Sequence, residues 1–139
     1  MKLNLKTLVV DAKTATCKFP FEVCKGMEVE LAYADRKQLD NIREVSLVQK
    51  FDPETGAPFK ELDTDVYIKN FAEALIKGWT GFTYAHLASL VLIEESGINP
   101  EEEIEFDIDT AVFLLEHSQV FDRWVVATSK RLDNFRTTK

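Results

Sequence analysis

Few residues in this 139-residue chain suit nucleophilic or metal chemistry: two histidines, His86 and His117, and two cysteines, Cys17 and Cys24. A zinc site needs about four nitrogen or sulfur ligands, and these side chains show no paired-ligand spacing. Neither histidine has a serine or cysteine nearby in a nucleophile motif. The sequence therefore predicts no metal, no cofactor and no catalytic residue, with both cysteines acting as small apolar side chains in or near strands.

The stretch IKGWTGFTY, residues 76–84, places Trp79 between Gly78 and Gly81. A large aromatic side chain between two glycines can belong to a ligand platform, a phosphate loop or a packing joint. A phosphate loop needs ordered glycines with a lysine or an open helix start, and this stretch has neither. We interpret Trp79 as a packing joint that ends a helix, with Gly81 turning the chain and the indole pinning two helices together.

The acidic residues are abundant and unevenly placed. The net charge is -7: residues 1–50 carry 9 basic and 7 acidic side chains, residues 51–128 carry 4 and 16, and residues 129–139 carry 4 and 1. The acidic centre opposes binding of nucleic acid, because phosphates would be repelled. No apolar run approaches the roughly 20 residues that cross a bilayer, and the N-terminus does not resemble a signal peptide. We expect a cytoplasmic protein that binds neither nucleic acid nor membrane.

The first third of the chain shows strand patterns. Residues 2–10 begin with alternation, and residues 27–33 alternate clearly. Residues 17–24 can supply another short strand, which Pro20 restricts to an edge or a bend. We therefore expect residues 1–34 to form a β-rich unit, a small hairpin or sheet.

Helical spacing follows in residues 35–139. The expected helices run from Asp35 to about Lys50, from Asp63 or Thr64 to Trp79, after Thr83, from Asp107 or Asp109, and after Ser118. Two prolines and a glycine predict a mobile loop at residues 51–60. The predicted fold is α+β and mostly α-helical, a single domain of residues 1–139 in which a small N-terminal β unit precedes about five helices around one core.

Large apolar side chains on the last two expected helices are candidates for the core or for protein contacts, and the sequence leaves both uses open. They join Trp79 as the candidate site residues: Phe113, Leu114, Phe121 and Trp124.

The order of three segments resembles a known family. EVELAYADRKQLDNIREVSLVQKF leads into the turn DPETGAP, ELDTDVYIKNFAEALIKGWTG follows, and EIEFDIDTAVFLLEHSQVFDRWVVATSKRLDNF comes later. This order is similar to that of the small tail assembly chaperones of long-tailed (siphovirus-type) bacteriophages. In that family an acid-rich helix commonly ends in a Trp-x-Gly joint, and a segment resembling Asn/Asp-x-Ala-x-x-Leu-Leu leads into a helix holding a Trp. The resemblance covers about residues 27–135.

The resemblance implies a non-enzymatic chaperone in the host cytoplasm, absent from the mature virion. It would bind the tape measure protein, keep it soluble and help to recruit tail tube protein, and we expect it to work as a homo-oligomer. Two other hypotheses stay open from the residues: a structural virion protein, such as a head–tail connector or tail completion subunit, and a small enzyme.

The charge layout generates a prediction about assembly. Head-to-tail contacts can bring the +2 of residues 1–50 and the +3 of residues 129–139 against the -12 of residues 51–128 in another copy. Exposed ion pairs contribute about 0–1 kcal/mol each, so apolar surface must supply most of the affinity. Sedimentation velocity should show concentration-dependent oligomers at low salt that weaken without vanishing at high salt. A strict monomer under all conditions would contradict self-assembly and favour the virion component.

Overall fold

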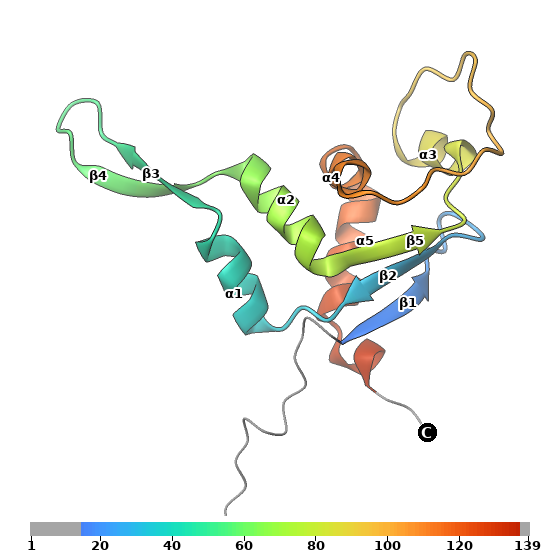
Figure 1. The fold of residues 1–139 in the computed structure, drawn as a ribbon, viewed down its shortest axis with the longest axis horizontal. Helices are drawn as coiled ribbons and strands as arrows, with labels where there is room; N and C mark the ends of the chain where they lie inside the picture. The colour runs from blue at the N-terminus through green and yellow to red at the C-terminus, as the bar shows by residue number, and fades with distance from the viewer. Residues whose placement is uncertain (1–14, 137–139) are drawn as a thin grey trace, which may run out of the picture.

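The computed structural model describes residues 15–136, so the strand expected at residues 2–10 lies outside the described residues. Helix accounts for 44% and strand for 22%, which confirms the α+β class and the five helices. Figure 1 shows their arrangement. The elements are β1 (Thr16–Pro20), β2 (Glu28–Ala32), α1 (Arg36–Glu44), β3 (Leu47–Phe51), β4 (Pro58–Leu62), α2 (Thr64–Leu75), β5 (Ile76–Thr80), α3 (Tyr84–Leu90), α4 (Ile108–His117) and α5 (Gln119–Lys130), followed by a 3-10 helix (Leu132–Phe135).

Three strands form an antiparallel sheet in the order β1-β2-β5. Pro20 is the last residue of β1, an edge strand, where its missing N–H is tolerated. Along β2 the side chains alternate as expected, with Val29 and Leu31 buried while Glu28 and Glu30 lie on the other face. One face of the sheet therefore belongs to the core, and the other carries charge.

The third strand of this sheet, β5, occupies residues that were expected to be helical. The helix was predicted to reach Trp79, but α2 ends at Leu75 and Trp79 lies in β5. The register shift between Glu30 and Leu31 leaves Lys77 as an extra residue, because Gly78 pairs with Glu30 and Ile76 pairs with Leu31. This bulge turns Ile76 and Trp79 to the same buried face although they are three residues apart. Their spacing therefore looked helical in the sequence.

A second correction concerns the end of α1, close to Ser46. The helix from Asp35 was expected to reach about Lys50, but α1 ends at Glu44. Ser46 is buried, and its hydroxyl donates to the carbonyl of Ile42 at 2.7 Å while accepting from the amide of Asn70 at 3.0 Å. Its carbonyl accepts from the N–H of Asp63 at 3.0 Å. One serine thus stops α1 and joins it to α2.

A β-hairpin encloses the loop expected at residues 51–60 and takes four of its ten residues into strands. β3 pairs antiparallel with β4 from Leu47↔Leu62 to Phe51↔Pro58, and only residues 52–57 connect the strands. Figure 1 shows this hairpin projecting beyond α1 and α2, away from α4 and α5. Strands β3, β4 and β5 also correct the division into a β-rich unit at residues 1–34 and a helical part at residues 35–139.

The helix starts follow local capping rules. The side chains of Asp35, Asp63, Thr83, Asp107 and Ser118 each accept a hydrogen bond from a backbone N–H three residues ahead. Each bond satisfies one of the donors that a helix start leaves free. All five predicted starts are therefore confirmed, and the alternatives resolve to Asp63 and Asp107.

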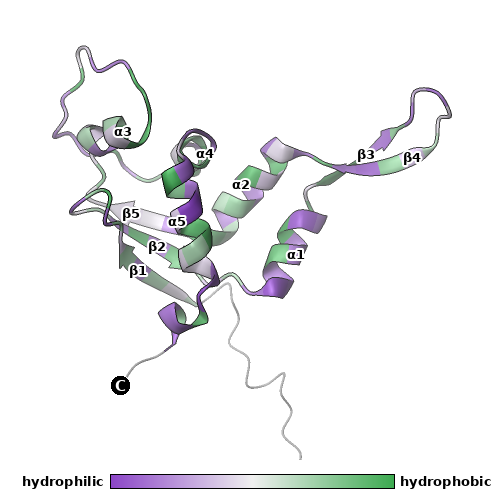
Figure 2. Cartoon of the chain, turned by 180° about the vertical axis from the view of Figure 1, so that it is seen from behind, coloured by the Kyte–Doolittle hydropathy of each residue, from purple (hydrophilic) through white to green (hydrophobic). Residues whose placement is uncertain are grey.

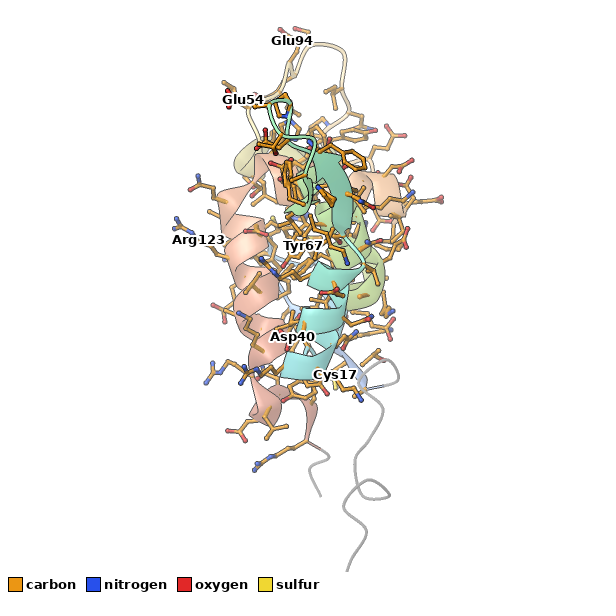
Figure 3. The ribbon with its side chains drawn as sticks, turned by 90° about the vertical axis from the view of Figure 1, so that its left-hand side faces the viewer. Cys17, Asp40, Glu54, Tyr67, Glu94 and Arg123 are labelled. Atoms are coloured by element: carbon orange, nitrogen blue, oxygen red, sulfur yellow. The ribbon has the colours of Figure 1, made fainter. Side chains whose placement is uncertain are left out.

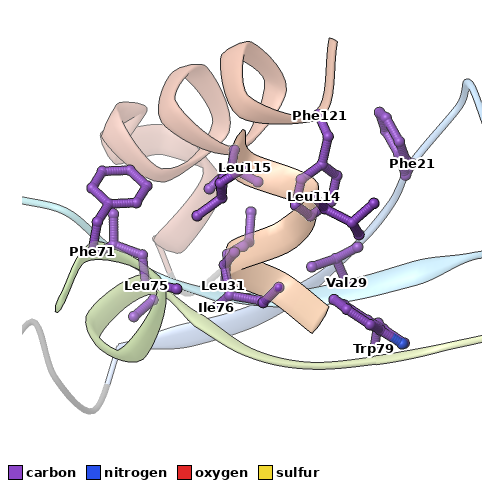
Figure 4. Close-up of a cluster of buried hydrophobic side chains, with 14 of the residues drawn as sticks. Phe21, Val29, Leu31, Phe71, Leu75, Ile76, Trp79, Leu114, Leu115 and Phe121 are labelled. Atoms are coloured by element: carbon purple, nitrogen blue, oxygen red, sulfur yellow. The ribbon is translucent and has the colours of Figure 1, made fainter. Parts of the chain in front are cut away.

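The core lies between the apolar face of the sheet and helices α2, α4 and α5. Figure 4 shows Val29 and Leu31 of β2 directed toward Leu114 of α4, with Leu75 of α2 beside them. These side chains are fully buried. Burial of each such side chain contributes about 1.5–3 kcal/mol, so this cluster is the main source of stability.

The turns at Gly26 and Gly81 approach each other closely, and this contact generates a prediction. Gly81 has φ +74°, and a Cβ placed there would lie 2.1 Å from the carbonyl oxygen of Gly26. Gly56, in the hairpin turn, has φ +73° with nothing within 4 Å. Left-handed backbone costs a non-glycine residue about 1–2 kcal/mol. Gly56→Ala should therefore lower the free energy of unfolding by about that amount, and Gly81→Ala by clearly more, in urea denaturation. Equal effects would contradict the close approach.

Candidate functional site

Trp79 is a buried packing residue in β5. The residue is 8% exposed, and its Nε1–H donates to the carbonyl of Ile104 at 2.9 Å. Its ring meets those of Phe82 and Phe106 edge-on, with centroids 5.2 Å and 4.9 Å apart. Trp79 is a packing residue, but the expected joint is corrected: it joins the sheet to the segment before α4 and does not pin two helices together.

The other four candidates divide into core and partly exposed residues. Leu114 and Phe121 are fully buried, so they pack in the core. Phe113 and Trp124 are half-buried. Phe113 stacks on His117 with centroids 4.3 Å apart, and Trp124 packs on Phe21 at 4.6 Å. The structure therefore does not gather the candidates into one site, and of the four only Phe113 and Trp124 retain surface for a partner.

The histidines and cysteines have structural surroundings. His86 completes the start of α3, because its Nδ1 accepts from the N–H of Thr83 at 3.2 Å while Thr83 Oγ1 accepts from the N–H of His86. Cys24 is buried beside Ser89, with 3.9 Å between Sγ and Oγ, and its sulfur faces the carbonyl of His86 rather than the imidazole. Burial raises the pKa of the Cys24 thiol, which disfavours the reactive thiolate.

Cys17 and Cys24 are both free thiols. Residues 15–136 hold no cluster of three or more histidine, cysteine or carboxylate side chains placed to bind a metal ion. Across the same residues no helix is long and apolar enough to cross a membrane.

The acidic segment between α3 and α4 is largely solvated. Glu94 accepts hydrogen bonds from the N–H and hydroxyl of Ser96, and these bonds hold the pKa of its carboxyl below the ordinary value. Leu92, two residues earlier, is 100% exposed. A bare leucine beside acidic side chains offers apolar contact together with negative charge.

The projecting hairpin exposes large aromatic side chains that the sequence interpretation missed. Phe51 is 63% exposed and Phe59 is 45% exposed. Figure 2 shows hydrophobic residues on the hairpin well away from the helical body. Residues 47–51, LVQKF, do not alternate between apolar and polar side chains, so no period-2 pattern identified this strand.

One apolar hollow lies on the surface of the helical body. It measures about 220 Å³ and lies between α2, α4 and α5. Its lining is mostly apolar with one carboxylate: Tyr67, Ile68, Phe71, Leu115, Val126 and Asp122. The hollow has the size and lining to take an apolar side chain with a cation beside it.

Comparison of the chain with models of protein families, with curated proteins and with solved structures gave no match in any of the three.

The surroundings of Trp79 generate a stability prediction. Trp79→Ala should lower the free energy of unfolding by about 3–5 kcal/mol, because a large buried aromatic is lost from between β5 and Ile104. Trp79→Phe should cost less, since it keeps a ring but loses the hydrogen bond. Urea denaturation measures both, with Leu92→Ala as an exposed control expected within about 0.5 kcal/mol of the wild type. An unchanged midpoint for Trp79→Ala would contradict the packing role.

Proposed function

We propose that this protein is a tail assembly chaperone of a long-tailed bacteriophage. It binds the tape measure protein in the host cytoplasm, keeps it soluble and helps to recruit tail tube subunits, without catalysis and without entering the mature virion. The proposal begins from the resemblance of residues 27–135 to that family.

The observation that carries the proposal is the placement of exposed apolar side chains beside charge. Phe51 and Phe59 stand out on the hairpin near Asp52 and Lys60, and Leu92 lies fully exposed before Glu94. A protein that covers an extended, apolar client transiently needs separate apolar contacts flanked by charge rather than one deep polar pocket. Several weak contacts along one client then add up to useful avidity.

The charge of the chain favours one kind of client. The net charge of -7 keeps the chaperone soluble and favours a client with basic segments. Leu92 with the neighbouring glutamates suits a client helix that shows apolar and basic residues together. Association through such a surface should be fast and salt-dependent.

Co-expression provides the test. Tape measure protein made alone should aggregate, and co-expression with this chain should move it to the soluble fraction and allow both to be co-purified. Leu92→Asp should reduce the recovered tape measure protein, because it replaces the exposed apolar contact with a charge. Glu95→Asp, three residues away, keeps the negative charge; it is the matched control and should have little effect.

Mass spectrometry of purified virions separates the chaperone from the structural alternative. A chaperone is absent from the particle, whereas a head–tail connector or tail completion subunit is present in fixed copy number. Detection of the chain in virions at a fixed copy number, together with failure to solubilise the tape measure protein, would contradict the proposal.

A further inference from the structure

The hairpin has no core of its own. We define the arm as residues 47–62, in which β3 and β4 pair with each other and run outward from Ser46 and Asp63. All side chains of the arm are exposed or half-buried. An isolated two-stranded hairpin is only marginally stable in water, so covering one face would stabilise it.

The strand register assigns the arm's side chains to two faces. Because paired residues point to the same side, Phe51, Pro58 and Lys60 share one face with Gln49. The opposite face carries Phe59 and an ion pair in which Lys50 Nζ lies 2.7 Å from Glu61 Oε2. Within residues 15–136 no ion pair involves Lys60. The first face thus combines an exposed aromatic ring with an available cation.

The hollow between α2, α4 and α5 is the complement of that face. It offers mostly apolar walls, with the carboxylate of Asp122 in its lining. Burial raises the pKa of Asp122, and the charge of Arg123 only partly offsets this effect. Figure 3 shows Arg123 pointing outward beside α5. A second cation at the hollow would therefore stabilise the carboxylate.

We propose that the arm of one copy docks on a second copy of this chain, with Phe51 entering the hollow and Lys60 pairing with Asp122. The arm projects away from α4 and α5, so it does not reach the hollow of its own chain in this fold (Figure 1). One chain carries both the aromatic ring with its cation and the hollow with its anion. This match of shape and charge selects a second copy as the occupant.

The contact is heterologous, since different surfaces of the two copies meet. Each added copy brings a new free arm and a new free hollow, so assembly continues unless the rotation closes a ring. The aromatic anchor supplies affinity, and the ion pair at its edge supplies orientation. The proposed function gives this self-association its use, and the docking rests on it only in that respect. The docking itself is tested below without any client.

Sedimentation velocity of the purified full-length chain is the experiment. The wild type should associate as concentration rises, and Phe51→Ala should weaken association by about thirtyfold, as loss of a hot-spot aromatic does. Phe59→Ala, on the opposite face of the same arm, is the matched control and should associate like the wild type. A monomeric wild type, or equal effects of Phe51→Ala and Phe59→Ala, would overturn the docking.

Charge reversal tests the partner residue. Lys60→Glu and Asp122→Lys should each weaken association by about tenfold, and the double variant should recover most of it because the pair is restored with opposite sign. A double variant no better than either single variant would overturn the pairing. Melting temperatures are measured first. If Asp122→Lys lowers the melting temperature, Asp122→Asn is used in its place. Adding Lys60→Glu to Asp122→Asn should then weaken association no further.

Mixing two variants tests the heterologous geometry. Phe51→Ala keeps an intact hollow, and Asp122→Lys keeps an intact arm, so an equimolar mixture should form a 1:1 dimer as its main species and associate more strongly than either variant alone. Absence of that dimer, at concentrations where the wild type associates, would overturn the proposal. Because no tape measure protein is present, these results stand apart from the co-expression test of the chaperone function.

Discussion

The pairing of β2 with β5 is the constraint on which the rest of the structure depends. It joins a strand near the N-terminus to one in the middle of the chain, and the bulge at Lys77 sets its geometry. With that extra residue, Ile76 and Trp79 lie on the buried side together with Val29 and Leu31. Without it, one of the two would face the charged side of the sheet, because side chains alternate along a strand. The apolar face that α2, α4 and α5 cover exists only because of this pairing.

Ser46 separates the packed body from the arm. Its hydrogen bonds lie at the end of α1, hold α2 through Asn70 and start the pairing that leads outward. Beyond it the chain leaves the core, and the side chains that a larger sheet would bury are exposed. The same serine thus makes the body compact and presents Phe51 and Phe59 to other molecules. Apolar surface kept at this distance from the core stabilises contacts with partners more than it stabilises the fold.

The side chains most able to take part in chemistry have structural surroundings in this fold. His86 closes the start of α3 and Cys24 fills a buried turn, while acidic side chains stay solvated in the segment before α4. Within residues 15–136 these side chains are therefore accounted for by capping, packing and solvation. The exposed aromatic residues, the acidic character and the hollow beside Asp122 are the features on which the proposed contacts with a client and with other copies rest.

The sequence by itself determined the helix starts, the alternation of β2 and the α+β class, because each depends on residues close together in the chain. Capping by Asp63 or Ser118 involves a backbone N–H only three residues away. Only the tertiary structure decided the fate of residues 47–51 and 76–80. Apolar residues three apart suit a helix and a bulged strand equally, and the choice rests on pairing with distant strands. The match between arm and hollow likewise required the fold, since Phe51 and Lys60 share a face through the pairing of two strands, and the hollow is assembled from three helices.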